Sequence, residues 1–154
     1  MQYDLGKSFD HEAQPHWDVE CMVIPSTPST LSVLRKRVVK FFSETPLSHE
    51  ELADFELAFG EACANALRHG SPNGDRDEIR VKCMRNSRLA VIEVSDNGYG
   101  FDPDNVPVPI PDSKRVGGMG IYLMKRLVDE VDFEFGSGTT VRLIKYSQNE
   151  LSEE

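Results

Sequence analysis

The sequence predicts an α+β protein, a two-layer sandwich in which a mixed, mostly antiparallel sheet carries its helices on one face. Segments with strand and helix periodicity follow one another in the order β-α-α-β-β-loop-α-β-β. A short link joins the two middle strand segments, and a Gly-Ser-Gly turn joins the last two. Because short links favour antiparallel neighbours, these observations predict hairpins and not parallel crossovers. At 154 residues the chain is long enough for one domain around one core.

The first half of this domain is predicted to be a strand followed by two helices. Apolar and acidic side chains alternate over residues 17–23, which is the period of a strand. A helix should follow the next turn, with Thr27 as its N-cap and Pro28 in its first position. The second helix opens with a capping box at residues 48–51, and Gly70 is a natural place for it to stop.

The second half is predicted to contain two hairpins separated by a long loop and a helix. Residues 79–84 alternate between apolar and polar, whereas residues 89–94 are nearly all apolar and indicate a central strand. The irregular segment between residues 97 and 117 is long for so compact a chain, and such loops are usually functional or mobile. A helix over about residues 121–128 and a hairpin over residues 131–146 complete the chain.

Composition limits the classes of function. There are 17 basic and 26 acidic residues, a formal charge of −9, and no basic cluster longer than residues 35–37. This argues against nucleic acid or an anionic membrane as the main partner. No apolar run approaches the length of a membrane span and the N-terminus lacks a signal peptide, so we expect a cytoplasmic protein. We expect its three widely spaced cysteines to be reduced, buried thiols.

The domain is expected to span residues 17–146. Residues 1–16 are polar and aperiodic and are interpreted as an N-terminal tail. Residues 147–154 are interpreted as an acidic C-terminal tail.

Glu61 and Asn65 are four residues apart on the second predicted helix, so their side chains leave the same face. A carboxylate can remove a proton from an attacking hydroxyl, and an amide oxygen can hold a Mg²⁺ ion whose other ligands are waters and phosphates. The pair therefore suits an ATP site. Taken alone, it could equally be a solvated helix face.

Two glycine-rich segments strengthen the ATP interpretation. Residues 96–101, Asp-Asn-Gly-Tyr-Gly-Phe, follow the central strand and place a carboxylate beside glycines that let a flat ring approach the backbone. A hairpin turn is the alternative, although the next strand segment is far away. Residues 117–120 lead into a helix, whose free N–H groups and dipole could hold phosphate; a flexible hinge is the alternative. Residues 138–140, Gly-Thr-Thr, could add a hydroxyl or form an ordinary turn.

In this order and spacing, the four segments resemble those of the GHKL ATPases, the superfamily with the Bergerat ATP-binding fold. Residues 61–70 look like the N-box of that superfamily, residues 96–100 like its first glycine box, residues 118–120 like its second and residues 138–140 like its final Gly-Thr element. Within the superfamily, the small size and the sequence from Met119 onward are most similar to the anti-sigma-factor serine/threonine-protein kinases.

The resemblance implies a role for each matching residue. Glu61 would be the general base for the substrate serine, Asn65 the Mg²⁺ ligand, and Asp96 the acceptor for the adenine amine. The other implied contacts are Gly98 and Gly100 at the base, Gly118 and Gly120 at the phosphates, and Thr139 at either end of the nucleotide.

Residues 101–117 would be the ATP lid. Within this segment, Lys114 or Arg115 could neutralise charge on the transferred phosphoryl group, or both could simply be solvated. The four prolines of the segment differ from what a loose lid needs.

The implied function is partner switching. The kinases that the chain resembles use ATP and Mg²⁺, form homodimers, hold a sigma factor and phosphorylate a serine of a STAS-domain antagonist. A module that binds ATP and partners without phosphotransfer is the alternative. We expect neither a sensor histidine kinase nor a clamp ATPase, because both need further helical or domain structure for which the chain has no room.

Overall fold

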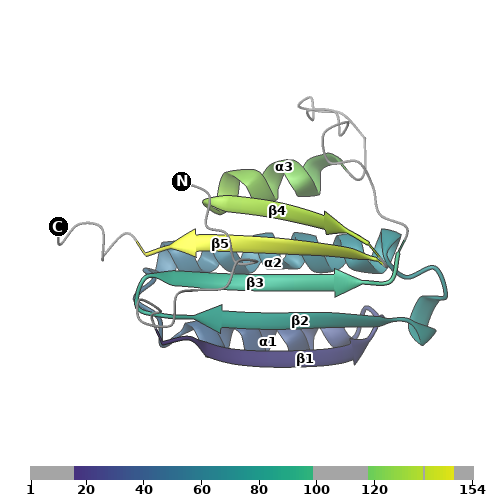
Figure 1. The fold of residues 1–154 in the computed structure, drawn as a ribbon, viewed down its shortest axis with the longest axis horizontal. Coiled ribbons are helices and arrows are strands. Elements are labelled where there is room, and N and C mark those ends of the chain that lie inside the picture. The colour runs from purple at the N-terminus through teal and green to yellow at the C-terminus, as the bar shows by residue number, and fades with distance from the viewer. Residues whose placement is uncertain (1–15, 99–117, 137, 148–154) are drawn as a thin grey trace.

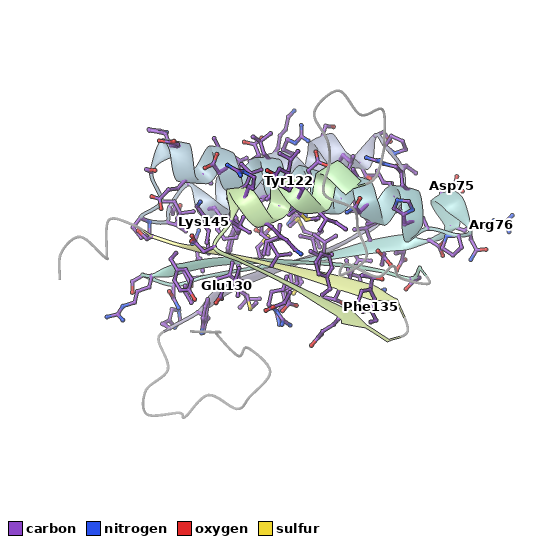
Figure 2. All side chains as sticks on the ribbon, turned by 90° about the horizontal axis from the view of Figure 1, so that it is seen from above. Asp75, Arg76, Tyr122, Glu130, Phe135 and Lys145 are labelled. Carbon is purple, nitrogen blue, oxygen red and sulfur yellow. The ribbon has the colours of Figure 1, made fainter. Side chains whose placement is uncertain are left out.

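A computed structural model describes residues 16–98, 118–136 and 138–147. These residues form a five-stranded sheet in the order β1-β2-β3-β5-β4, covered on one face by helices (Figures 1 and 2). The strands are β1 (Asp18–Pro25), β2 (Glu78–Arg85), β3 (Leu89–Asp96), β4 (Glu130–Phe135) and β5 (Thr139–Tyr146), and the α-helices are α1 (Thr30–Phe42), α2 (His49–His69) and α3 (Gly118–Leu127). Every strand pairing in the described residues is antiparallel, so the predicted α+β sandwich is confirmed. None of these helices is both long and apolar enough to cross a membrane.

The main core lies between the helices and the sheet. The strand β3 occupies the centre of the sheet, as its apolar sequence predicts. Fully buried side chains from α1, α2, β3 and β5 meet there, and the rings of Phe42 and Phe55 pack edge to face at 5.0 Å. Leu89, Val91 and Ile144 form a second, smaller cluster. Side chains alternate along a strand, so this second cluster lies on the face opposite the helices.

The helix α2 begins as the sequence predicts. The hydroxyl of Ser48 accepts from the Glu51 amide at 3.0 Å, and the Glu51 carboxylate accepts from the Ser48 amide at 2.9 Å. This reciprocal capping box satisfies two N–H groups that have no partner inside the helix. It fixes the start of the helix that carries Glu61 and Asn65.

Two local predictions are wrong. The helix α1 begins at Thr30 with Ser29 as its N-cap, not at Thr27. The carbonyl of Thr27 accepts from both the amide and the hydroxyl of Thr30, which makes residues 27–30 a turn. Cys21 is exposed, because it alternates outward on β1. Cys63 and Cys83 are buried as expected, and burial raises the pKa of each thiol to about 12.

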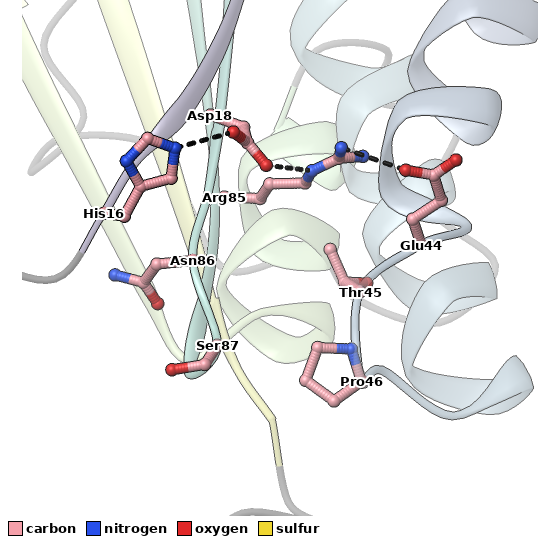
Figure 3. A pocket seen from close by; sticks show the side chains of 8 residues that line it. All are labelled: His16, Asp18, Glu44, Thr45, Pro46, Arg85, Asn86 and Ser87. Atoms are coloured by element: carbon pink, nitrogen blue, oxygen red, sulfur yellow. Dashed lines mark hydrogen bonds and ion pairs between the residues drawn. The ribbon is translucent and has the colours of Figure 1, made fainter.

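A charged cluster joins β1, β2 and the end of α1 at one end of the sheet (Figure 3). We call Arg85, Asp18, Glu44 and Phe41 the Arg85 cluster. The guanidinium of Arg85 donates to Asp18 at 3.2 Å, to Glu44 at 3.1 Å and to the carbonyl of Phe41. It also lies over the Phe41 ring, 4.4 Å from the centroid. Each guanidinium nitrogen therefore has an acceptor beside a cavity of about 490 Å³.

Candidate functional site

Glu61 and Asn65 lie on the side of α2 that packs against the first turn of α3. A Cβ built on Gly120 would stand 2.8 Å from Oε2 of Glu61 and 3.7 Å from Oδ1 of Asn65. The backbone of Gly120 thus faces both side chains with no side chain of its own between. The free N–H groups at the start of a helix lie in its first turn, together with the positive end of its dipole. The fold therefore brings a carboxylate, a carboxamide and a helix amino end to one place.

Two buried polar atoms near these segments have no partner in the described part of the chain. They are Nδ2 of Asn65 and Oγ1 of Thr139, whose side chains are 5% and 3% exposed. A buried polar group without a hydrogen bond costs about 1–3 kcal/mol. Such atoms are typical of a site that a polar ligand completes.

Asp96 is the last residue of β3, and its carboxylate is buried. Its Oδ1 accepts from the Gly98 amide at 2.8 Å and from the Thr139 amide at 3.3 Å. The first bond is local to the turn that follows β3, and the second crosses to β5, where Thr139 is the register partner of Asp96. These two amides fix the orientation of the carboxylate, so it forms a positioned acceptor.

The pKa of Asp96 is raised above its ordinary value of 3.8. Burial is the main cause, because removal from water penalises the charged form. The amides of Gly98 and Thr139 and the charge of Arg80 lower the pKa, while the charge of Asp77 raises it. The desolvation outweighs the two hydrogen bonds, so this carboxylate is costly to ionise until a donor reaches it.

The carboxyl end of α2 lies directly against the turn after β3 (Figure 1). The amide of Asn97 donates to the carbonyl of Gly70 at 3.2 Å. A Cβ on Gly98 would stand 2.5 Å from both the carbonyl oxygen of His69 and Cα of Gly70. In the sheet β3 already lies between β2 and β5, so residues 96–98 are not the turn of a hairpin, and the close approach shows that they dock on the helix. The helix α2 therefore makes two contacts in this region. Glu61 lies against Gly120 of α3, and the C-cap Gly70 lies against Asp96.

The predicted site residues fall into two groups. Glu61, Asn65 and Gly120 meet between α2 and α3, while Asp96, Gly98 and Thr139 meet where β3 ends and β5 begins. Gly118 is the first residue of α3. Gly100, Lys114, Arg115 and the predicted lid at residues 101–117 lie outside the described residues.

Two residues near Asp96 were missed by the sequence analysis. Arg80 donates to the side-chain oxygen of Asn97 at 3.3 Å. Its register partner on β3 is Ser95, so pairing the two predicted strands would have placed Arg80 beside the turn. Gly70 was interpreted as a helix stop and as the last residue of the N-box-like segment, with no contact of its own, although its Cα lies against both Asp96 and Gly98. Nothing local in the sequence signals that contact.

Comparisons with known proteins identify the family of the chain. The family described as "Histidine kinase-like ATPase domain" matches residues 24–145. The chain belongs to this family. Among its relatives, the serine-protein kinase RsbW of Bacillus velezensis is 33% identical over 138 residues, covering 84% of this chain and 86% of the relative. RsbW of Bacillus subtilis is 32% identical with the same coverage. Within the histidine kinase-like ATPases, the chain is therefore a member of the RsbW family.

Solved structures of histidine kinase-like ATPases show the same fold. The RsbU and RsbW domains of a Mycobacterium tuberculosis protein match with a TM-score of 0.61 and 20% identity, covering 83% of this chain and 32% of that one. The histidine kinase domain of a blue-light activated kinase from Erythrobacter litoralis matches with a TM-score of 0.52 and 18% identity. That match covers 84% of this chain and 64% of the other. At these identities the likeness concerns the fold alone.

Proposed function

We propose that this RsbW-family chain is an ATP-dependent serine protein kinase and an anti-sigma factor. It transfers the γ-phosphoryl group of ATP to a serine of a STAS-domain antagonist, and it sequesters a sigma factor. The observation that carries the kinase proposal is the contact of Gly120 with Glu61 and Asn65. It sets a carboxylate beside the helix end that would hold the phosphates. The relatives named serine-protein kinase RsbW support this assignment.

The adenine end of the nucleotide is assigned to Asp96. Its oriented carboxylate accepts from the exocyclic amine of adenine, a donor that guanine lacks at that position. Gly98 is assigned to the base pocket on the family resemblance, while the space that its side chain would fill is taken by the end of α2. The hydroxyl of Thr139, which has no hydrogen-bond partner among the described residues, is assigned to the same end because the Thr139 amide bonds Asp96. Gly100 is assigned to the same base pocket on the family resemblance.

The phosphate end is assigned to the first turn of α3. Amides near Gly118 and Gly120 and the positive end of the helix dipole attract the anionic phosphates. Mg²⁺ would be held by Asn65 and by phosphate oxygens, and when bound it would neutralise phosphate charge. The amide oxygen of Asn65 would be the ligand, and its buried amide nitrogen, which has no partner among the described residues, would be free to donate to a phosphate oxygen. Arg115 is assigned to the phosphates from its place in the predicted lid.

Glu61 is assigned as the general base. Its carboxylate takes the proton of the substrate serine hydroxyl as the serine oxygen bonds to the γ-phosphorus. The bond from that phosphorus to the bridging oxygen breaks, and ADP leaves with the bonding electrons. Proton removal by a positioned side chain contributes about 10²–10⁴-fold to such a rate.

The partners are assigned from the family resemblance and from charge. A formal charge of −9 suits protein partners with basic patches, and not nucleic acid. We propose a cytoplasmic homodimer that captures a sigma factor with nucleotide bound. The unphosphorylated antagonist competes for that capture, and phosphorylation of its serine expels it by adding about two negative charges.

Labelled ATP incubated with a STAS-domain protein encoded beside this chain tests the proposal. The wild type should transfer label to one serine, and an antagonist with that serine changed to alanine should stay unlabelled. Nucleotide binding without any label transfer would instead support the module that binds partners and does no chemistry.

A further inference from the structure

We propose that Gly70 is a positioning residue for Asp96. The space that a side chain at residue 70 would fill is occupied by the Asp96 carboxylate. Because glycine has no side chain in this space, the carboxylate can keep the orientation that faces the nucleotide base. This inference rests on the proposed role of Asp96 as the acceptor for adenine, and it gives the end of α2 a part in base selection.

The backbone conformation of Gly70 does not require glycine. Its φ is −102° and its ψ is 5°, angles that other residues adopt at a helix end. A glycine that ends a helix for conformational reasons usually has a positive φ. Gly74, four residues later, begins a short 3-10 helix and does have a conformational reason to be glycine, with φ +64° and nothing within 4 Å of a built Cβ. Gly70 has an ordinary φ, so the requirement for glycine at this position must come from the atoms that surround it.

The surroundings of Gly70 leave no room for a side chain. A Cβ built there would overlap Cγ and Oδ2 of Asp96 and would lie 2.5 Å from its Cβ. These atoms cannot easily move aside. Oδ1 of the same carboxylate is held by the amides of Gly98 and Thr139, and the backbone of Asp96 is paired in the central strand.

Gly70 cannot easily withdraw either. Its amide donates to the carbonyl of Ala66 at 3.0 Å, and its carbonyl accepts from the amide of Asn97. The hydroxyl of Ser71 donates to the same Ala66 carbonyl at 3.0 Å. Both peptide groups of Gly70 are therefore tied, one to the helix and one to the turn after β3. A methyl group at residue 70 must turn the Asp96 carboxylate and break its amide bonds.

Calorimetry on the full chain tests this with ADP and GDP as probes. Gly70→Ala should weaken ADP binding about tenfold or more, the loss expected for one charge-assisted hydrogen bond, and should reduce the preference for ADP over GDP. Gly60→Ala is the matched control on the same helix. A Cβ there would meet only the flexible tip of Arg35, at 3.0 Å, so ADP binding should be unchanged.

A second background separates positioning from helix capping. Thermal unfolding without nucleotide should show that Gly70→Ala lowers the midpoint in the wild type but has little effect when Asp96→Gly has removed the carboxylate. An equal loss in both backgrounds would mean that Gly70 acts only on its own helix, and would overturn the inference.

The outcomes also separate this inference from the assignment beneath it. A wild type that binds ADP and GDP equally would refute the base contact of Asp96, and the role of Gly70 in selection with it. A wild type that prefers ADP, together with a Gly70→Ala variant that keeps the same affinity and preference, would refute the role of Gly70 alone.

Discussion

The two ends of the sheet differ in how their polar side chains are paired. At one end, the three nitrogens of Arg85 donate to Asp18, Glu44 and the Phe41 carbonyl, and the guanidinium stacks on an aromatic ring. At the other end, Asp96 is buried with a raised pKa, and the hydroxyl of Thr139 beside it has no hydrogen-bond partner among the described residues. Each guanidinium nitrogen of the Arg85 cluster has an acceptor within the protein, whereas the Asp96 end has a buried hydroxyl without a hydrogen-bond partner among the described residues.

We infer that this difference separates groups that stabilise the fold from groups that bind a ligand. Buried polar atoms in native proteins nearly always have partners, so exceptions concentrate where a ligand supplies them. Cavity size is a weaker guide in this molecule. The cavity of about 490 Å³ lies beside the self-paired Arg85 cluster, away from the residues with unmet hydrogen bonds. Four experiments test whether the two ends differ in this way.

The largest effect is expected at Glu61, the proposed general base. Glu61→Gln should slow phosphotransfer to the antagonist by about 10²–10⁴-fold, because the amide cannot take the serine proton. ADP affinity should stay close to that of the wild type. Glu56→Gln, on the same helix but paired at the surface with Arg35, should leave both rate and affinity unchanged. Equal transfer rates for Glu61→Gln and the wild type would remove Glu61 from the chemistry.

The next effect is expected at the adenine acceptor. Asp96→Asn should weaken ADP binding roughly ten- to a hundredfold, since a charge-assisted hydrogen bond is worth about 1.5–3 kcal/mol. Asp18→Asn is the matched change at the self-paired end and should leave ADP binding as it is. Titration calorimetry measures both. Equal losses for the two variants would abolish the distinction between the ends of the sheet.

A smaller effect, on stability and not on binding, is expected at the Arg85 cluster. Arg85→Ala should lower the free energy of unfolding by about 1–2 kcal/mol through the lost stacking and carbonyl bond. The exposed partners contribute less, so Glu44→Gln should cost below about 1 kcal/mol. Urea unfolding measures these changes. The comparison fails if Arg85→Ala weakens ADP binding as much as Asp96→Asn does.

The smallest effect is a pH dependence that belongs to Asp96. Without nucleotide, the stability of the wild type relative to Asp96→Asn should fall as the pH rises from below 3.8 through the raised pKa of Asp96. In that window the unfolded chain has lost a proton that the folded chain keeps, so the free energy of unfolding decreases as the pH rises. Other carboxylates titrate in both proteins and largely cancel. Urea unfolding across a pH series measures the difference, and a flat difference would show that Asp96 is not desolvated.

The sequence predicts those features that depend on neighbours along the chain. The capping box at residues 48–51, the central position of β3 and the final hairpin are all confirmed, because side-chain periodicity and turn chemistry are local. The N-cap of α1 was predicted at Thr27 but lies at Ser29. Both residues are good caps, and only the turn geometry decides between them.

The missed parts of the site depend on contacts between distant segments. Gly70 and Asp96 touch only because α2 ends where β3 ends, and helical propensity carries no information about that meeting. Arg80 was missed for the same reason, since its position beside Asn97 follows from the pairing of β2 with β3. The roles of all the predicted site residues, the lid and the domain limits stay predictions.

A single uninterrupted helix joins the two halves of the site, and this makes its length a functional constraint. Glu61 and Gly70 both belong to α2 and its cap, so the distance along the helix between the proposed general base and the residue beside the proposed adenine acceptor is set by helical rise, about 1.5 Å for each residue. One residue inserted between them would shift the two halves by that rise and rotate them by about 100°. Loops elsewhere in the chain can change length, but we expect this segment to tolerate substitution far better than insertion or deletion.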